Sequence, residues 1–363
     1  MESLLETNEN STRQNCQKVI NNGLTRYTLS DSIAEHHKRE LASHNYYIQS
    51  RIGSGGQAIV YRVTHEDTRE SYAAKAVVRS RFRNFNRNGN GGAASVHNLD
   101  IDAELNAEIQ AMQILQGNKY CVKLKCVVES RIAVYLIMEL LSGGDLLHKA
   151  FQTELSELNA ISICSQILSA LKSFNQLGIY HRDVKPENIM FLSTKTSDYR
   201  LKFIDFGLAH VSNPRFKSDS NPQKTVYSRG LIGTSEYLPP EVFNNEEEYR
   251  LDKVDIYGVG VMMYLILTGI RPFGKNCNEN EREPDFSSKI WNGRSENVRD
   301  FVKYLMESNA NMRPCMDEAL DRCMTIEWNL RKAKVWNGIR DFIVPFSYES
   351  KKSNRIVCST RYV

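Results

Sequence analysis

The pattern of hydrophobic and polar residues divides the chain into four regions. Residues 1–45 are rich in Asn, Ser, Thr and charged residues with few apolar runs, which predicts a flexible extension. Residues 46–140 consist mainly of short alternating runs typical of β-strands, with one segment of helical spacing. Residues 141–325 are mostly of helical spacing, and residues 326–363 form a basic and aromatic extension. We therefore expect a small β-rich lobe, a larger helical lobe and two extensions.

Five segments of the second region are expected to form strands. Two of them lie on either side of a glycine-rich turn in YYIQSRIGSGGQAIVYRVT, and SYAAKAVVRS, CVKLKCVVES and RIAVYLIMEL supply the other three. One helix is predicted in DIDAELNAEIQAMQILQG, whose apolar residues recur at helical spacing before Gly117. The segment NFNRNGNGGAASVHN between the third strand and this helix is best interpreted as a loop.

The most apolar segment, VDIYGVGVMMYLILTGI at residues 254–270, is interpreted as the buried helix of a large soluble domain. It is short for a membrane span, it contains Asp255, and a stop signal at Gly269 lies at its end. We therefore expect no membrane span. The first residues, MESLLETNEN, also lack the basic and apolar regions of a signal peptide.

Composition narrows the class of protein further. Hydrophobic residues make up 41% and charged residues 25% of the 363 residues, which is typical of a soluble globular protein. The 47 basic and 43 acidic residues leave a net charge of +4, which does not indicate nucleic acid as a partner. The eight cysteines form no CxxC pair and lack histidines at ligand spacing. We therefore expect reduced thiols in an intracellular protein of the cytoplasm or nucleus.

A glycine-rich segment, IGSGGQAIVYRV, begins the series of candidate functional motifs. It places Gly53, Gly55 and Ala58 in the pattern GxGxxG, followed by Val60. Glycine lets backbone N–H groups approach a phosphate closely. A glycine-rich hairpin turn is at least as good an interpretation of this segment alone, and Ala58 in the third place weakens the phosphate interpretation. Because the pattern does not open a helix, it argues against a Rossmann dinucleotide site.

A lysine within an apolar strand is the next candidate. In YAAKAV, Lys75 alternates with Ala73 and Val77, so its side chain points where small apolar side chains point. A buried ammonium group needs a partner of opposite charge. Glu108 in the helix NAEIQAMQIL is the candidate partner, and Glu104 one turn earlier is an alternative that spacing leaves open.

Two polar segments follow in the third region. The run GIYHRDVKPENIMFL contains Asp183, Lys185 and Asn188 between apolar flanks, and the later strand-like run LKFIDFGLAH ends on Asp205. A solvated turn is the alternative for the first run. Two acidic residues, an Asn and a Lys near strand ends suit a magnesium-phosphate site, because magnesium prefers hard oxygen ligands and takes few of them from protein.

In order along the chain, these segments and the later runs GTSEYLPPE, DIYGVGV and NMRP resemble the motifs of the eukaryotic protein kinases over residues 46–325. The run DVKPEN is similar to that of serine/threonine kinases, and SGGDLL resembles the calcium/calmodulin-dependent kinase group. The resemblance implies an α+β bilobal protein kinase fold. Its small lobe would hold five antiparallel strands plus one helix in residues 46–140, and its mostly helical lobe would comprise residues 141–325.

The resemblance also implies a serine/threonine protein kinase that transfers the γ-phosphate of ATP with Mg²⁺ as cofactor. Asp183 would accept the proton of the substrate hydroxyl, and Lys185 would reach the transferring phosphate. Asn188 and Asp205 would bind Mg²⁺, and His181 would be structural, packing under the Phe of the DFG motif.

For the nucleotide, the resemblance implies that Lys75, held by Glu108, contacts the α- and β-phosphates. Met138 would lie at the back of the adenine pocket, and Glu139 and Leu141 would offer their backbone to adenine. The full set of ATP-binding residues that it implies is Ile52, Gly53, Gly55, Val60, Ala73, Lys75, Glu108, Met138, Glu139, Leu141, Asp145 and Met190.

Substrate and regulatory residues are implied in the same way. Glu187 and Thr234 would bind the protein substrate, with Thr234 favouring serine and threonine acceptors. Asp145 and Glu187 match acidic positions that face arginines upstream of the acceptor, which predicts an arginine preference. Thr225 and Ser228 are the candidate phosphorylation sites of the activation segment, although neither lies in the usual register.

The carboxy-terminal extension has aromatic and basic residues at helical spacing in residues 326–345, which fits a calmodulin target or an autoinhibitory segment. A helix packed permanently on the large lobe is the alternative. For the whole chain, the alternative is a catalytically silent pseudokinase scaffold that binds nucleotide. A small-molecule phosphotransferase is disfavoured, because the segment YLPPE is present with Glu241 placed to pair with Arg313.

Overall fold

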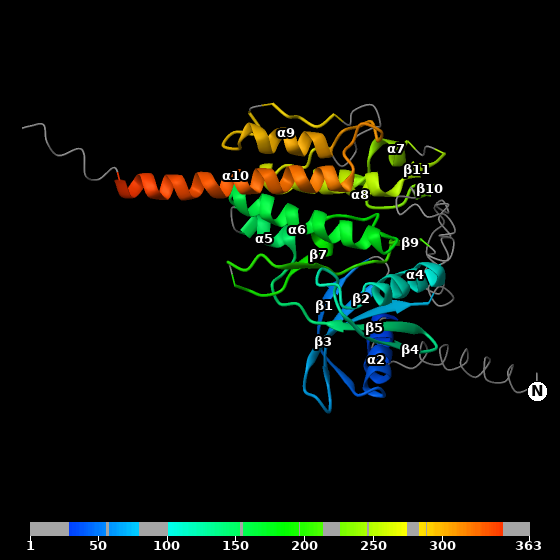
Figure 1. Ribbon diagram of the computed structural model, residues 1–363. Helices are drawn as coiled ribbons and strands as arrows, with labels where there is room; N and C mark the ends of the chain where they lie inside the picture. The colour runs from blue at the N-terminus through cyan, green and yellow to red at the C-terminus, as the bar shows by residue number, and fades with distance from the viewer. Residues whose placement is uncertain are drawn as a thin grey trace, which may run out of the picture. The chain divides into compact units, whose positions relative to one another are not determined.

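The computed structural model separates into two compact units (Figure 1). The small unit comprises Met1–Arg87 and Lys125–Met138, and the large unit comprises Asn88–Leu124 and Glu139–Val363. Within them, the structure describes residues 29–55, 58–79, 101–152, 155–195, 197–212, 226–244, 247–273, 283–287 and 289–343.

The small unit is built on a five-stranded sheet with the strand order β1-β2-β3-β5-β4. β1 pairs with β2 and β2 pairs with β3 in antiparallel register. The sequence prediction of five strands is confirmed, and their bounds are β1 Tyr46–Ser54, β2 Ala58–His65, β3 Ser71–Val78, β4 Leu124–Glu129 and β5 Ala133–Glu139.

Helix α2, Leu29–Ala42, covers one face of this sheet. Leu41 is fully buried in a core cluster with Tyr61, Val63 and Tyr135 of the strands. Alternate residues of a strand point to opposite faces, so this cluster leaves the other face of β2 and β3 for different contacts. The helix was not expected, because the polar composition before residue 45 predicted a flexible extension. A few apolar and aromatic contacts outweigh that composition here.

The large unit is mostly helical, with short two-stranded sheets between its helices. Its elements are α4 Ile101–Ile114, α5 Leu146–Gln152, α6 Glu157–Gln176, β6 Ile179–Tyr180, the 3₁₀ turn Pro186–Asn188, β7 Ile189–Phe191, β8 Leu201–Phe203, β9 His210–Val211, β10 Tyr227–Ser228, the 3₁₀ turn Ser235–Tyr237, α7 Pro240–Phe243, β11 Tyr249–Arg250, α8 Leu251–Thr268, α9 Glu296–Leu305 and α10 Met316–Ile343. The pairs are β6 with β9, β7 with β8 and β10 with β11.

Helix α8 forms the core of the large unit, as the sequence predicted. Nearly all of its residues from Leu251 to Leu267 are buried, and it packs against α6 and α9. Gly269 ends it in the left-handed conformation at φ 72°, with its N–H bonded to the carbonyl of Leu265 at 2.8 Å. Among the described residues, no helix has the length and apolar character needed to cross a membrane.

A buried ion pair ties α7 to the turn before α10. The Arg313 guanidinium donates two parallel hydrogen bonds to the Glu241 carboxylate at 2.8 and 3.0 Å. This confirms the pairing that the sequence predicted. Its planar fork geometry fixes the position of α7 at the end of the activation segment.

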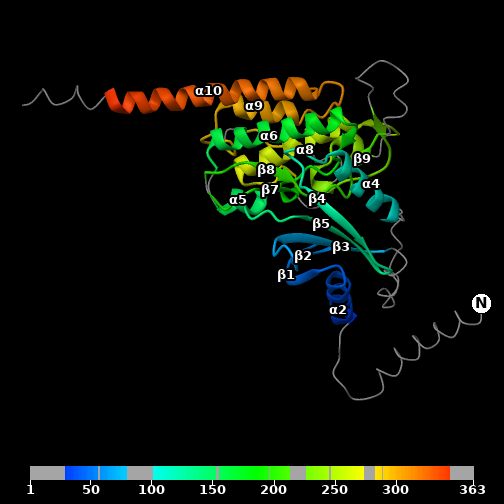
Figure 2. The same ribbon diagram turned by 60° about the horizontal axis from the view of Figure 1, so that its bottom comes forward.

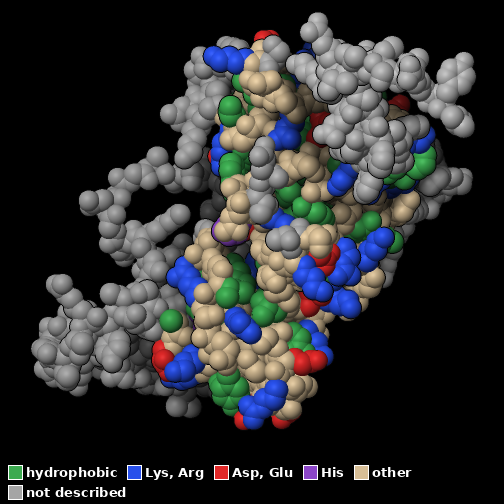
Figure 3. Space-filling view, turned by 90° about the vertical axis from the view of Figure 1, so that its left-hand side faces the viewer, with side chains coloured by type: hydrophobic (Ala, Val, Ile, Leu, Met, Phe, Trp, Pro, Cys, Tyr) green, Lys and Arg blue, Asp and Glu red, His purple; other side chains and the backbone are tan. Residues whose placement is uncertain are grey.

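Helix α10 packs along α6 and continues beyond it (Figures 1 and 2). Cys323 and Ile326 are buried, whereas every described side chain from Arg331 to Val335 is exposed. Figure 3 draws the side of the molecule that lies at the left of Figure 1, where basic and acidic side chains are interspersed with hydrophobic ones.

Candidate active site

The loop between β6 and β7 brings together the three predicted catalytic residues. Asn188 donates its Nδ2 hydrogens to the backbone carbonyl of Asp183 at 2.9 Å and to its Oδ2 at 3.0 Å. Lys185 Nζ lies 2.7 Å from the same carboxylate oxygen. The carboxylate of Asp183 is therefore fixed by an amide and an ammonium group, and the side chain is largely buried.

Thr234 completes this network from a distant part of the chain. Its backbone N–H and its hydroxyl donate to Asp183 Oδ1 at 3.0 and 2.6 Å. Lys185 Nζ donates to the Thr234 hydroxyl at 2.7 Å. The predicted substrate-binding threonine thus contacts both the candidate base and the candidate phosphate-binding lysine.

Gly233 allows Thr234 to approach so closely. Its φ of 126° lies in the region that favours glycine, and an added Cβ would lie 2.5 Å from a Leu238 methyl and 2.8 Å from the Arg182 carbonyl. Sequence reasoning did not assign this residue a role. The available signal was its position next to Thr234 in the run GTSEYLPPE.

Asp255 of α8 holds the backbone of the loop between β6 and β7. Its two carboxylate oxygens accept hydrogen bonds from the backbone N–H groups of His181 at 2.9 Å and Arg182 at 2.7 Å. Arg182 has a φ of 63°, a strained conformation for a residue with a side chain, and these bonds hold it there. Burial raises the pKa of Asp255 to about 7, while the two backbone hydrogen bonds act in the opposite direction.

His181 is structural, as the sequence predicted. Its ring packs against Phe203 and Phe206, with ring centroids 4.9 and 5.3 Å apart. Burial lowers the pKa of His181 to about 4, and the nearby Asp183 acts weakly in the other direction. The imidazole is therefore neutral at physiological pH and fills space beneath the Phe of the DFG motif.

The two predicted metal ligands lie at the same end of the β7–β8 pair. Ile189 is paired with Phe203, and Ile204 donates its N–H to the Asn188 carbonyl at 3.0 Å. This register places Asn188 beside Ile204, which directly precedes Asp205 of the DFG motif. The Nδ2 of Asn188 is occupied by Asp183, so its Oδ1 is the atom that remains for a cation.

These residues fit a divalent cation. An amide oxygen and a carboxylate are the hard ligands that magnesium takes from protein when phosphate and water supply the rest. Among the described residues, no group of three or more His, Cys, Asp or Glu side chains is arranged to hold a metal. A site built by Asn188 and Asp205 would therefore depend on the phosphates of the nucleotide.

In the small unit, three predicted ATP-binding residues lie side by side on adjacent strands. Gly53 of β1 faces Val60 of β2, and Val60 faces Lys75 of β3. Ala73 lies two residues from Lys75 and so shares its face of the sheet, opposite to the face covered by α2. Gly55 closes the turn by donating its N–H to the Ala58 carbonyl at 2.9 Å.

The other predicted residues of the small unit are Ile52, which is exposed on β1, and Met138, which is buried near the end of β5. On α4 of the large unit, Glu108 is buried with 3% of its surface exposed. Glu104 is only partly buried, so burial favours Glu108 as the acidic partner. The ion pair of Lys75 with either residue stays a prediction.

The last residue of β5 and the segment after it contain the remaining predicted adenine contacts. The N–H of Glu139 donates to the Lys123 carbonyl at 3.0 Å, so only its own carbonyl is left for a ligand. Its side chain pairs with Lys202. Leu141 is partly buried, and Asp145 forms a β-bridge with Met190, which places these two predicted residues together.

The predicted substrate-binding region contains two unsatisfied buried atoms. Glu187 Oε2 and the Tyr237 hydroxyl have no hydrogen-bond partner among the residues that the structure describes. Burial raises the pKa of Tyr237, and the charge of Glu187 adds to the effect, so the two groups lie near each other. A buried carboxylate oxygen without a donor is costly, which indicates a place for a cationic group.

The structure describes one of the two predicted regulatory residues, Ser228. Ser228 lies on β10, opposite Tyr249 of β11. The Tyr249 hydroxyl donates to the Gly230 carbonyl at 2.6 Å, and Arg182 Nε donates to the Leu208 carbonyl at 2.7 Å. Thr225 lies outside the described residues.

Comparison with known proteins is consistent with this geometry. Residues 46–323 match the family described as the protein kinase domain. The chain is 30% identical to calcium-dependent protein kinase 1 of Oryza sativa subsp. japonica over 76% of its own length and 49% of the rice protein. It is 31% identical to death-associated protein kinase 2 of Homo sapiens, over 78% of this chain and 72% of the human protein.

It is also 29% identical to the death-associated protein kinase dapk-1 of Caenorhabditis elegans, over 86% of this chain and 22% of the nematode protein. The chain thus spans about half the length of the rice relative and about a fifth of the nematode relative.

Proposed function

The chain belongs to the protein kinase family, and we propose that it is a serine/threonine kinase that transfers the γ-phosphate of Mg-ATP to protein substrates. The observation that carries this proposal is the network in which Asp183 is held by Lys185, Asn188 and Thr234. Each member of the network has the chemistry that phosphoryl transfer requires at its position.

In this proposal, Asp183 orients the acceptor hydroxyl and takes its proton as the bond to phosphorus forms. The hydrogen bonds from Thr234 and Asn188 hold the carboxylate in one orientation, so little reorganisation is needed during the reaction. Lys185 lies 2.7 Å from the same carboxylate and places a positive charge beside the transferring phosphate.

Candidate nucleotide-binding residues lie within each unit. Lys75, on the sheet face that also carries Val60 and Ala73, would contact the phosphates. Asn188 and Asp205 would hold Mg²⁺, which when bound neutralises charge on the phosphates. Proposing Mg²⁺ in particular rests on the amide and carboxylate ligands.

The direct test is transfer of labelled phosphate from Mg-ATP to a serine peptide by the wild type and by Asp183→Asn. We expect transfer by the wild type and a loss of at least about a hundred-fold in the variant, with ATP binding retained. Equal and negligible transfer by both proteins, with ATP bound, would favour the pseudokinase scaffold.

We further propose a preference for arginine upstream of the acceptor. The unpartnered Oε2 of Glu187 supports this, because an arginine side chain would supply the missing donor. Asp145 is a second candidate contact, although its Oδ1 already accepts from the His148 N–H at 2.7 Å.

Glu187→Gln should raise the KM for an arginine-bearing peptide while leaving that for a glutamine-bearing control peptide nearly unchanged. Equal effects on the two peptides would remove the basis for an arginine preference.

We propose that residues 326–345 bind calmodulin or act as an autoinhibitory segment. Met324, Trp328 and Val335 are exposed by 54%, 59% and 61%, and their spacing places them on one side of α10. Lys332 lies over the Trp328 ring at 4.7 Å. Residues 344–345 lie outside the described part of the chain. The rice relative is named as calcium-dependent, which agrees with a calcium-linked partner.

Phosphorylation of Thr225 or Ser228 is proposed as a means of activation. Full activity of the unphosphorylated protein would remove this proposal. We also propose that the protein acts inside the cell, in the cytoplasm or nucleus, since its phosphate donor would be ATP. The five cysteines described by the structure are free, which suits a reducing compartment.

A further inference from the structure

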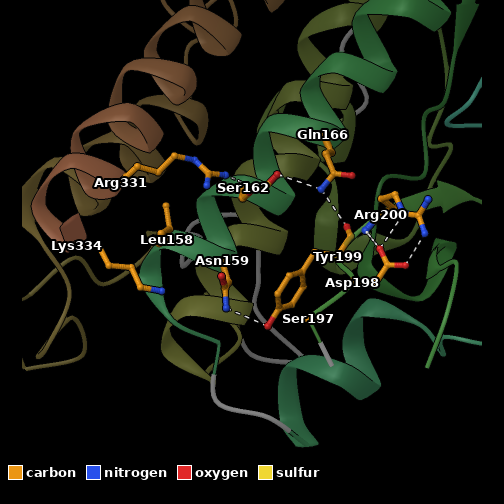
Figure 4. Close-up of a pocket in the computed structure, with 10 residues that line it drawn as sticks. All are labelled: Leu158, Asn159, Ser162, Gln166, Ser197, Asp198, Tyr199, Arg200, Arg331 and Lys334. Atoms are coloured by element: carbon orange, nitrogen blue, oxygen red, sulfur yellow. Dashed lines mark hydrogen bonds and ion pairs between the residues drawn. The ribbon is translucent and has the colours of Figure 1, made fainter. Parts of the chain in front are cut away.

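The large unit has a cavity between α6, α10 and the loop from β7 to β8. Its volume is about 770 Å³ (Figure 4). It contains none of the catalytic, nucleotide or substrate residues discussed above. Its walls are formed by residues 158–166 of α6, 197–200 of the loop, and Arg331 and Lys334 of α10. We propose that this cavity is a docking site for an acidic peptide segment of a partner protein.

The loop wall of the cavity is held rigidly. The Tyr199 hydroxyl accepts a hydrogen bond from Asn159 at 2.9 Å, and its backbone carbonyl accepts one from Gln166 at 3.0 Å. Asp198 receives two hydrogen bonds from Arg200 at 2.9 and 2.8 Å. Figure 4 shows these bonds along one side of the cavity. A wall fixed before binding loses little conformational entropy when a ligand arrives.

The charges of the cavity favour an anionic ligand. Its lining contains Arg200, Arg331 and Lys334 but only one acidic residue, Asp198. Asp198 is already neutralised by Arg200, whose hydrogen bonds hold the pKa of that carboxyl well below its usual range. The acid is therefore not available to repel or to bind a ligand.

On the α10 wall, one cation is committed and the other is available. Arg331 pairs with Glu327 at 2.6 Å, and it also lies 3.4 Å from the Ser162 hydroxyl. Lys334 has no ion pair or hydrogen bond within the described structure. It lies about two turns after the buried residue Ile326, and Figure 4 shows its ammonium group near Leu158 and Asn159 at the start of α6.

The size and the neutral groups of the cavity favour a peptide over a simple anion. A volume of about 770 Å³ lies in the range that holds organic ligands rather than a single small ion. Asn159 uses its Nδ2 on Tyr199, which leaves its side-chain carbonyl as an acceptor for a peptide N–H. Lys334 lies near Asn159, so a peptide that places an acidic side chain at Lys334 can also donate a backbone N–H to Asn159.

The test uses the full chain and a fluorescein-labelled peptide of alternating glutamate and serine, followed by fluorescence anisotropy without ATP. We expect binding that weakens as salt is added, and no binding of the matched peptide with glutamine in place of glutamate. Because no phosphate transfer is measured, failure of this proposal is distinguishable from failure of the kinase assignment.

Lys334→Glu should weaken binding about ten-fold, since it places a repulsive charge in the cavity. Lys332→Glu is the matched control, because it makes the same charge change on the opposite side of the same helix, about 160° away. Equal weakening by both variants would overturn the site in favour of general attraction to a basic helix. Displacement of the peptide by inorganic phosphate, but not by chloride of the same ionic strength, would overturn the peptide in favour of a small anion.

Discussion

At the scale of single residues, Thr234 connects the activation segment to the catalytic loop. Its hydroxyl donates to Asp183 and accepts from Lys185, so one side chain orients both functional groups. Asp255 fixes the backbone of the same loop, because its carboxylate accepts hydrogen bonds from the N–H groups of His181 and Arg182. In the proposed reaction both would be positioning residues, because they hold Asp183 or the backbone beside it in place.

Thr234→Val should lower kcat by about ten- to a hundred-fold, because it removes a hydrogen bond to a charged carboxylate and leaves Lys185 without one partner. Thr234→Ser keeps the hydroxyl and should restore most of the activity. Steady-state phosphorylation of a serine peptide measures both. Ser235→Ala is the control, since Ser235 is exposed and its hydroxyl donates to the neighbouring Glu236 at 3.1 Å rather than to Asp183. Equal activity of the Val and Ser variants would contradict this role.

His181 should make folding sensitive to acid. Its pKa of about 4 in the folded protein is lower than the ordinary value of 6.5, so between these values the unfolded chain binds a proton that the folded chain does not. The free energy of unfolding should therefore fall as pH decreases from 6.5 to 4, by up to about 1.4 kcal/mol per pH unit. This contribution is fully present above pH 6.5.

The measurement is urea unfolding of the large unit, followed by tryptophan fluorescence, at several pH values in this range. His181→Phe keeps an aromatic ring and should show a smaller dependence on pH. An unchanged slope in this variant would assign the acid sensitivity to other groups, such as His37, whose pKa burial also lowers to about 4.

At the scale of elements, α2 is held to the sheet by a buried aromatic cluster. The His37 ring lies edge-on to Tyr135, with centroids 5.4 Å apart, and its Nδ1 is hydrogen-bonded to the Tyr135 hydroxyl at 2.8 Å. Leu41 is buried one turn later. The face of β3 that carries Lys75 is free of α2 because strand residues alternate between faces.

Tyr135→Phe should destabilise the small unit by about 1–3 kcal/mol, because it leaves the buried His37 nitrogen without its partner. Tyr47→Phe is a matched control: Tyr47 is exposed, its hydroxyl bonds to Glu66 at 3.1 Å, and its loss should cost less than about 0.5 kcal/mol. Hydrogen exchange of the α2 amides separates the two cases. Similar exchange in both variants would show that the buried bond contributes little.

At the scale of the whole molecule, α10 combines two sides of different character. Cys323 and Ile326 face the large unit and are buried, whereas Met324 and Trp328 are exposed. Helix α10 continues past the start of α6, as Figures 1 and 2 show. A partner can therefore bind α10 without first removing it from the fold.

Trp328→Glu should weaken binding of calcium-loaded calmodulin by more than about ten-fold, because an exposed aromatic side chain that would anchor the partner becomes a charge. Titration of labelled calmodulin with the full chain measures this. Phe151→Glu is the control, since Phe151 is exposed by 61% on α5 rather than on α10. The same loss in both variants, or tight binding without calcium, would contradict the assignment.

Much of the fold and of the candidate site could be predicted from the sequence. The five strands follow from alternation, the buried α8 follows from its uniform apolar character, and the pairing of Arg313 with Glu241 follows from motif order. The region around α2 could not be predicted in this way. Its composition is polar, and among its described side chains only His37 and Leu41 are buried and reveal its packing.

The sequence by itself determined which chemical groups are present and in which order. Each of Lys75, Asp183, Asn188 and Asp205 lies in a short motif, whose residues stay close together because they are neighbours along the chain. Only the tertiary structure decided what joins segments far apart in the chain. The contact of Thr234 with Asp183 and the cavity between α6, α10 and the β7–β8 loop both depend on packing. Such contacts depend on burial, backbone strain and close approach in space, which spacing along a chain does not specify.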